Sequence, residues 1–217
     1  MISGPRTWLS RSFLMLLILG MGCASVPDFT YFTMAYTLLP QRHKHRALAE
    51  SLRVSDMEIT PAYDKDKIVY RFSPYQFQYY NYMLWAVKPN KMVTGLVVRH
   101  LEHSGLFEVV SRDYGETRPQ YEMSGVLEAI EELDSGDEWF AHIALSLRLT
   151  RFRNDAVVWS YRIDKKKRVY NKEPVYVVKA LSELMEQGMN EVVEDLRGFL
   201  SRNQSVLKTE TKGEDTP

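Results

Sequence analysis

The sequence contains 217 residues, of which 45% are hydrophobic and 26% are charged, the proportions of an ordinary folded domain. This composition excludes a disordered chain, a collagen-like repeat and a polytopic membrane protein. The 28 basic side chains balance the 28 acidic ones, so no overall field attracts nucleic acid, and the one cysteine can form neither an internal disulfide nor, alone, a zinc site.

The N-terminus has the pattern of a bacterial lipoprotein signal peptide. Arg6 and Arg11 precede the apolar run 13–19, which is too short to span a bilayer and suits the hydrophobic region of a signal peptide. Cys23 follows small residues, where a lipoprotein signal peptidase leaves a new N-terminus. We therefore predict a signal peptide at residues 1–22 and lipid attachment at Cys23, with more than one acyl chain for stable anchoring. The alternative is an ordinary cleaved signal peptide and a chance cysteine.

The residue after the cysteine bears on the membrane that holds the anchor. In bacteria of the enteric type, Asp at this position retains a lipoprotein at the inner membrane, whereas this chain has Ala24. We therefore expect an anchor in the outer membrane, on its periplasmic face, with the inner membrane as the alternative.

The first part of the mature chain alternates between breakers and short β-rich runs. Residues 23–47 are expected to form the lipid anchor and a tether, with one short strand at 36–39. Further strands are predicted at 52–59, 68–72 and 76–80, because these runs are rich in β-branched and aromatic residues and are separated by Pro and Asp-Lys turns.

A helix and a meander follow. Apolar residues recur at helical spacing from Pro89 to His103, and Ser104-Gly105 closes this helix before a short strand at 106–110. Alternating apolar residues then predict three antiparallel strands, joined by an Asp-Ser-Gly-Asp turn and an Asn-Asp turn. These strands comprise residues 121–129, 139–149 and 157–163.

The C-terminal part is predicted to be a second long helix, from Pro174 to Leu200, with a wide apolar face. Gly188 lies inside this helix and destabilises it relative to alanine, so the apolar face has to be well packed. Residues 201–217 are predicted to be a disordered tail. The whole pattern predicts an α+β fold over residues 48–200. It comprises an antiparallel sheet, with a C-terminal three-stranded meander, and two long helices packed on one face.

Three polar groups are candidates for a functional site. His100 and His103 have no third ligand at a readable spacing, so a partly buried or interface histidine is favoured over metal binding. The acidic residues between 128 and 138 are expected to spread into solvent at a hairpin tip. The basic run 165–168 is expected to follow the third strand, either solvated or touching anionic headgroups. No nucleotide or nucleophile motif occurs, so neither an enzyme nor a cofactor is expected.

The most unusual feature is a run of eight aromatic residues between Tyr70 and Trp85, more than a core needs. Exposed aromatic side chains favour interfaces because they combine an apolar body with a polar edge. The sequence is compatible with two roles for this segment: core packing alone, or contact of some of its residues with a subunit, a partner or lipid. The candidate interaction surface consists of Tyr75, Phe77, Tyr79, Tyr80, Tyr82 and Trp85.

Several motifs, taken in order, resemble the auxiliary lipoproteins of MCE-type ABC lipid-transport systems, the paraquat-inducible outer-membrane lipoprotein family. The similarity covers roughly residues 30–200. It is carried by the run from Met57 to Arg71, with Pro61, Tyr63, Asp64 and Ile68-Val-Tyr-Arg71, and by Ser73-Pro74, Tyr79-Tyr80, Leu84-Trp85-Ala86, Pro89, Ser104-Gly105-x-Phe107, Tyr121-x-Met-x-Gly125, Trp139-x-Ala141 and Val178-x-Ala-Leu-Ser182.

This resemblance implies a non-catalytic protein on the inner leaflet of the outer membrane. It would pair with an MCE-domain protein whose tunnel crosses the periplasm from an ABC permease and its ATPase, and it would form a homo-oligomeric ring in some systems. The alternative is a stand-alone lipid-binding or structural envelope lipoprotein.

Overall fold

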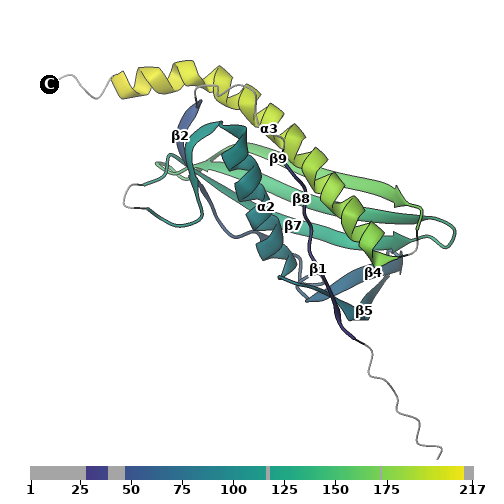
Figure 1. The fold of residues 1–217 in the computed structure, drawn as a ribbon. Coiled ribbons are helices and arrows are strands. Elements are labelled where there is room, and N and C mark those ends of the chain that lie inside the picture. Colours follow the sequence, from purple (N-terminus) through teal and green to yellow (C-terminus); the bar gives the residue numbers. More distant parts are fainter. Residues whose placement is uncertain (1–27, 39–46, 116–117, 172, 213–217) are drawn as a thin grey trace, which may run out of the picture.

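The fold is α+β, as predicted: a nine-stranded sheet is covered on one face by two helices (Figure 1). The structure is a computed structural model that describes residues 28–38, 47–115, 118–171 and 173–212. The predicted signal peptide, Cys23 and Ala24 lie outside these residues.

The predicted meander forms one side of the sheet, from β7 (Tyr121–Asp134) in its interior to β9 (Ala156–Val169) at its edge. β7, β8 (Trp139–Arg151) and β9 pair antiparallel along nearly their whole lengths. β9 extends beyond the predicted strand, so the basic run 165–168 is part of the strand and does not follow it.

The other side of β7 pairs with short strands that run parallel to it, so the sheet is mixed and not antiparallel throughout. β2 (Ala49–Val54), β3 (Glu58–Ile59) and β4 (Lys67–Ser73) contact successive parts of β7 in parallel, and β6 (Phe107–Ser111) is parallel to β2. Parallel strands need a crossover between them, and here a helix provides it. Side-chain alternation within a strand does not reveal the direction of its partners, which is why the sequence did not show the parallel pairs.

β4 turns back at Ser73-Pro74, as predicted, into β5 (Gln76–Trp85), and the two strands form an irregular antiparallel hairpin. β5 in turn pairs in parallel with β1 (Thr30–Phe32) at the margin of the sheet. The first strand therefore precedes its predicted position at 36–39; residues 36–38 are not in a strand and Leu39 lies outside the described residues.

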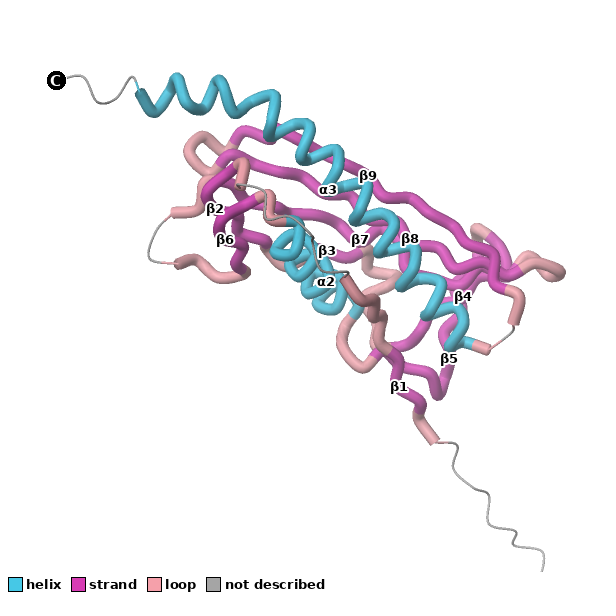
Figure 2. The backbone as a smooth tube through the Cα atoms, turned by 45° about the horizontal axis from the view of Figure 1, so that its top comes forward, coloured by secondary structure: helices cyan, strands magenta, loops and turns pink. Residues whose placement is uncertain are grey.

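Two helices cover the same face of the sheet (Figure 2). α2 (Pro89–Ser104) begins with a proline in its first turn and ends at Gly105, whose φ of 62° is the left-handed conformation that glycine adopts without strain. α3 (Pro174–Lys212) packs on β8 and β9 and continues past Leu200, so residues 201–212 form part of the helix and not a disordered tail. Among the described residues, neither helix is long and apolar enough to cross a membrane.

Part of the expected tether belongs to the fold. After β1 the chain lies over the helices, where the Met34 amide donates to the sulfur of Met92 on α2 and the Ala35 amide donates to Ser182 Oγ on α3. Met34 is buried. Residues 28–38 of the expected tether therefore belong to the domain, while residues 39–46 lie outside the described part of the chain.

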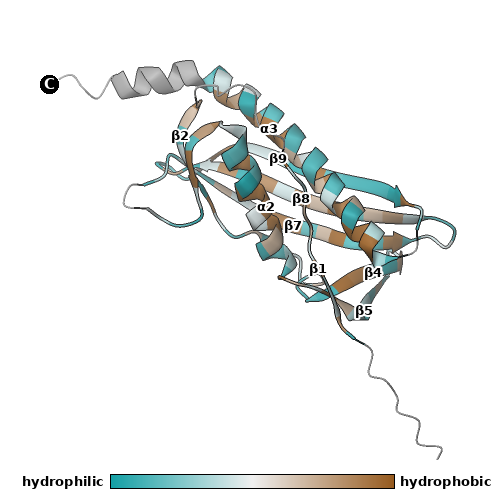
Figure 3. Ribbon diagram, viewed as in Figure 1, coloured by the Kyte–Doolittle hydropathy of each residue, from teal (hydrophilic) through white to brown (hydrophobic). Residues whose placement is uncertain are grey.

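The core fills the space between the helices and the sheet. The apolar residues of α2 and α3 are buried against the sheet, as the helical periodicity predicted, and hydrophilic residues line the outer side of both helices (Figure 3). Fully buried core side chains include Leu101, Ile143, Leu145, Met185 and Val192.

Candidate functional site

The predicted interaction surface lies on β5 and the turn before it, but its residues differ widely in exposure. Tyr75, at the hairpin turn, is 92% exposed, whereas Trp85, at the end of β5, is 3% exposed and part of the core. Phe77 and Tyr82 are exposed to an intermediate degree, at 37% and 44%. Trp85 is thus unavailable to a partner, because its side chain is part of the core where β5 pairs with β1.

Two residues of this segment hold the turn 60–66 against the sheet. The ring of Phe77 packs edge-on against Tyr63, with 5.6 Å between ring centroids, and the guanidinium of Arg71 lies over the Phe77 ring at 5.1 Å from its centroid. The Tyr79 hydroxyl donates a 3.2 Å hydrogen bond to the carbonyl of Ala62. Phe77 and Tyr79 therefore both have a structural role, as contacts of the turn 60–66, and Tyr79 also packs against the core.

Tyr80 faces a buried carboxyl group. Its hydroxyl lies 3.2 and 3.1 Å from the two oxygens of Glu132, whose side chain is almost completely buried. Burial raises the pKa of Glu132 to about 7, with a further increase from Asp134, although the hydrogen bond from Tyr80 opposes the shift. Burial and the neighbouring Glu132 carboxylate raise the pKa of Tyr80, so its hydroxyl stays a donor.

A second buried carboxylate, Glu131, anchors a polar network on the sheet face opposite the helices. Arg71 donates to its Oε1 at 2.5 Å, the Tyr63 hydroxyl donates to Oε2 at 2.5 Å, and His142 Nδ1 lies 2.8 Å from Oε1. Burial favours the neutral acid, but the hydrogen bonds from His142, Arg71 and Tyr63 outweigh it and hold the pKa of Glu131 below its usual value. Glu131 is thus a buried, ionised group with three donors.

The network continues along the strands toward solvent. His142 Nε2 lies 3.1 Å from Oδ1 of Asp164, and Arg162 donates to Oδ2 of Asp164 at 2.6 Å and to Glu128 at 2.8 Å. Ser146 donates to the other oxygen of Glu128. Both ring nitrogens of His142 face carboxylates, so only the doubly protonated ring donates to both.

This arrangement differs from the predicted solvated hairpin tip. Glu131 and Glu132 are fully buried, and each has a specific partner. Glu131 is paired with Arg71 of β4 and hydrogen-bonded to Tyr63 of the turn 60–66, whereas Glu132 accepts from the neutral hydroxyl of Tyr80 on β5. The network stabilises this end of the sheet, and within the described residues no group of His, Cys, Asp and Glu side chains is arranged to hold a metal ion.

His100 is a core residue of α2. It is almost completely buried, and its Nδ1 lies 3.2 Å from the hydroxyl of Tyr36. Burial lowers the pKa of His100 to about 4, so its ring is neutral near pH 7. His103, in the last turn, does not join it in a cluster of possible metal ligands.

The basic run pairs with acidic groups of its own domain. Lys165 and Lys167 of β9 bind Glu191 and Glu183 of α3, and Arg168 binds Glu138 beside the first turn of the meander. The two lysine pairs hold α3 against β9, the edge strand of the sheet. Mutual neutralisation leaves the run poorly suited to attract anionic headgroups.

The Glu131–His142 contact was missed by reasoning from the sequence, although one signal could have found it. The Asp-Ser-Gly-Asp turn pairs Asp134 with Trp139, and this register places Glu131 opposite His142. Two further exposed aromatic residues, Phe29 and Tyr31, were missed because they fall in the expected tether.

Comparison with known proteins gives the family. Residues 36–193 match the family model described as the ABC-type transport auxiliary lipoprotein component. The chain belongs to this family. As an ABC-type transport auxiliary lipoprotein, it is anchored in the bacterial envelope and associated with an ABC transport system.

Two solved structures show the same fold as this auxiliary lipoprotein. A protein from Xanthomonas campestris has 20% sequence identity and a TM-score of 0.70, over 81% of this chain and 99% of that one. A second crystal structure, of a protein described as uncharacterized, has 13% identity and a TM-score of 0.63, over 78% of this chain and 99% of that one. No curated protein sequence matches the chain.

Proposed function

We propose that this auxiliary lipoprotein is a non-catalytic component of an ABC/MCE-type system that moves lipids across the bacterial envelope. In this role Cys23 carries the lipid anchor in the outer membrane, and the domain docks the tunnel of an MCE protein on the periplasmic side. The observation that carries the proposal is the family match over residues 36–193. The sequence around Cys23 and Ala24 supports the anchor and the membrane.

The arrangement of polar groups supports a non-catalytic role. The two buried carboxyl groups with shifted pKa values, Glu131 and Glu132, are hydrogen-bonded to their own neighbours. A general acid or base has to reach a substrate within hydrogen-bond distance. Neither group is accessible for that, so both serve the fold.

Tyr75 is the best candidate for a contact with the partner within the predicted aromatic surface. Its side chain is almost fully exposed at the tip of the β4–β5 hairpin. Of the aromatic residues that follow, Tyr82 is partly exposed beside Phe29, and the others contact the turn 60–66, Glu132 or the core. Exposed tyrosines suit protein interfaces. A homo-oligomeric ring around the tunnel end is the assembly that this function favours.

The decisive experiment is purification of the full-length protein from native membranes through a C-terminal tag after mild crosslinking, with mass spectrometry of proteins and lipids. We expect an MCE protein, a permease or ATPase, and a diacylglycerol-modified peptide that begins at Cys23. Recovery of the lipidated protein alone with stoichiometric phospholipid would contradict the proposal and favour the stand-alone carrier.

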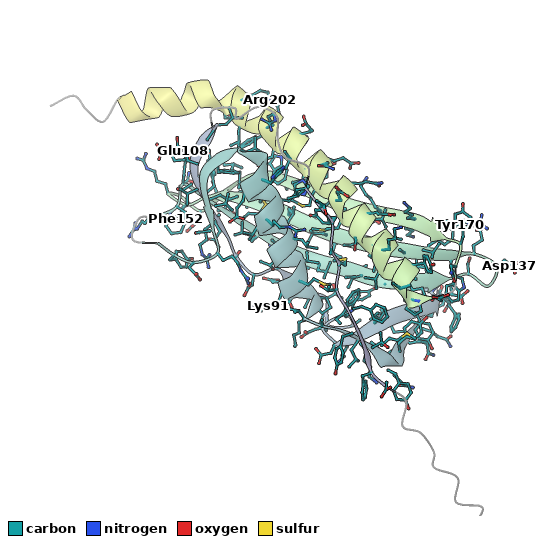
Figure 4. The ribbon with its side chains drawn as sticks, in the orientation of Figure 1. Lys91, Glu108, Asp137, Phe152, Tyr170 and Arg202 are labelled. Carbon is teal, nitrogen blue, oxygen red and sulfur yellow. The ribbon has the colours of Figure 1, made fainter. Side chains whose placement is uncertain are left out.

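Comparing variants of two exposed tyrosines, Tyr75 and Tyr114, distinguishes a docking role of Tyr75 from a general effect of removing a surface aromatic side chain. Tyr75→Ala should reduce the recovered MCE protein several-fold, because interface aromatics carry much of the binding energy. Tyr114→Ala is the matched control, since Tyr114 is 61% exposed and lies near Phe152, at the end of the molecule away from β1 (Figure 4). Equal recovery with both variants would reject Tyr75 as the contact.

A further inference from the structure

A cluster of exposed aromatic side chains lies on β1 and β5, close in sequence to the predicted lipid attachment at Cys23. Phe29 precedes β1, Tyr31 is in it, and Tyr82 is in the neighbouring strand β5; their exposed fractions are 53%, 62% and 44%. The rings of Phe29 and Tyr82 are 5.8 Å apart, and Tyr31 lies opposite Leu84 in the strand pair. We call these three residues the β1/β5 aromatic patch.

The patch residues are not partly buried members of the core. Phe32, the residue after Tyr31, packs against the core opposite the buried Trp85, so the alternation of the strand turns Tyr31 outward. Tyr82 and Tyr75 lie toward opposite ends of β5, so this patch is separate from the hairpin tip proposed as the partner contact.

The length of chain before the patch limits its distance from the anchor. Five residue steps separate Cys23 from Asp28, and a fully extended chain spans at most about 18 Å over that length. α3 alone, with 39 residues, is about 58 Å long. Whatever path the tether takes, the patch stays near the membrane that holds Cys23, while the far end of the domain does not.

We propose that the β1/β5 aromatic patch inserts into the headgroup region of the bilayer that holds the lipid anchor and sets the orientation of the domain. Tyr and Phe suit this depth because their rings enter the apolar boundary while the tyrosine hydroxyls remain hydrated. The proposal rests on the proposed lipid attachment at Cys23.

This orientation gives the molecule a membrane end and a free end. Figure 1 shows the chain entering at β1 and β5, whereas β2, β6 and the end of α3 lie at the opposite end. With the patch in the headgroups, β2, β6 and the turn that contains Phe152 point away from the membrane (Figure 4). A lipid anchor alone leaves the domain free to rotate, and a second point of attachment removes that freedom.

The test uses the lipidated full-length protein in vesicles of phosphatidylethanolamine and phosphatidylglycerol that contain a lipid with a nitroxide at the top of its acyl chain. Cys23 is the only cysteine and is blocked by its lipid, so Tyr31→Cys, Tyr82→Cys and the control Val157→Cys each give one site for a fluorophore. Val157 is 58% exposed and lies beyond the turn that contains Phe152.

We expect the lipid-borne nitroxide to quench the fluorophore at positions 31 and 82 at least about twofold more than at position 157. Adding Phe29→Ser and Tyr31→Ser to the Tyr82→Cys protein should remove most of this difference, because the rings that insert are gone. Quenching that came only from the short tether to Cys23 would persist in this variant. Val109→Ser with Tyr114→Ser in the same background is the matched control and should leave the quenching unchanged.

Three results would overturn the proposal. Equal quenching at all three positions would mean a freely rotating domain, and a fluorophore at position 82 shielded from water but not quenched would assign the patch to a second copy of the chain. In both cases Cys23 lipidation and recovery of the MCE protein would still stand. Protein that is not membrane-bound and carries no lipid would instead reject the anchor, and with it both this inference and the proposed attachment.

Discussion

Gly188 of α3 lies directly against Ile163 of β9. A Cβ at Gly188 would be 2.7 Å from Cγ2 and 2.8 Å from Cδ1 of Ile163, closer than carbon atoms pack. The helix therefore approaches the sheet at this point only because the position has no side chain. This contact explains why α3 tolerates a glycine in its interior, where glycine costs about 1 kcal/mol relative to alanine.

Gly188→Ala should destabilise the protein despite its better helix propensity. Overpacking in a filled core costs about 1–3 kcal/mol, which exceeds the gain in propensity. The control is Gly95→Ala in α2, where a Cβ meets nothing within 4 Å and should stabilise by up to about 1 kcal/mol. Urea unfolding of both variants checks the pair, and a stabilising Gly188→Ala would show that Ile163 is free to move away.

Arg71→Met should destabilise the protein by about 2–3 kcal/mol, because it removes one donor from a fully buried carboxylate. His142 and Tyr63 would still hold Glu131, which keeps the loss at the lower end of the range for a broken buried pair. Arg112→Met breaks a pair with Asp56 in which both side chains are 44% exposed, so it should cost less than about 1 kcal/mol. Similar losses of unfolding free energy for both variants would mean that Arg71 is not a significant partner of Glu131.

The helices and the meander were predictable because their patterns are local. Alternation over β7–β9 and helical spacing in α2 and α3 each depend on neighbours along one segment. The end of α3 was misplaced at Leu200, since the residues beyond it carry few large apolar side chains and the pattern that marks a helix fades there.

The features of the fold that could not be predicted depend on contacts between segments distant in the sequence. The parallel contacts of β2, β3 and β4 with β7, and the packing of Met34 against Met92, bring together residues that no local pattern connects. The same limit applies to the aromatic segment. Its composition shows that it has more aromatic residues than a core needs, but only the structure, with β5 paired to β1, shows which of them stay exposed.

Trp85 and Tyr75 should respond in opposite ways to truncation. Trp85→Ala removes a buried indole and should cost about 3–5 kcal/mol of unfolding free energy. Tyr75→Ala changes an exposed side chain and should alter stability by less than about 0.5 kcal/mol while it weakens recovery of the transport partner. Thermal and urea unfolding, measured beside the purification from membranes, check both halves; a stable Trp85→Ala protein would contradict the placement of this ring in the core.

Glu132→Gln should change how stability depends on pH. The folded-state pKa of Glu132, about 7, lies above the ordinary value of 4.5 for a glutamate side chain, so the folded protein binds this proton more tightly than the unfolded chain does. The contribution of this group to stability therefore falls as pH rises from about 4.5 to about 7, by up to about 3 kcal/mol. Glutamine stays neutral and can still accept the Tyr80 hydrogen bond, so the variant should be more stable than the parent above pH 7, and the difference should disappear toward pH 4.5.

Unfolding free energies measured across this pH range check the direction of the effect. Glu58→Gln, which alters an exposed carboxyl group on β3, is the control for removal of a negative charge. Tyr80→Phe gives the converse test: without the hydroxyl, ionised Glu132 loses the donor that opposes its pKa shift, so the variant should lose more stability at high pH than at low pH. A constant difference between Glu132→Gln and the parent protein at every pH would place the carboxyl group in contact with water and contradict its burial beside Tyr80.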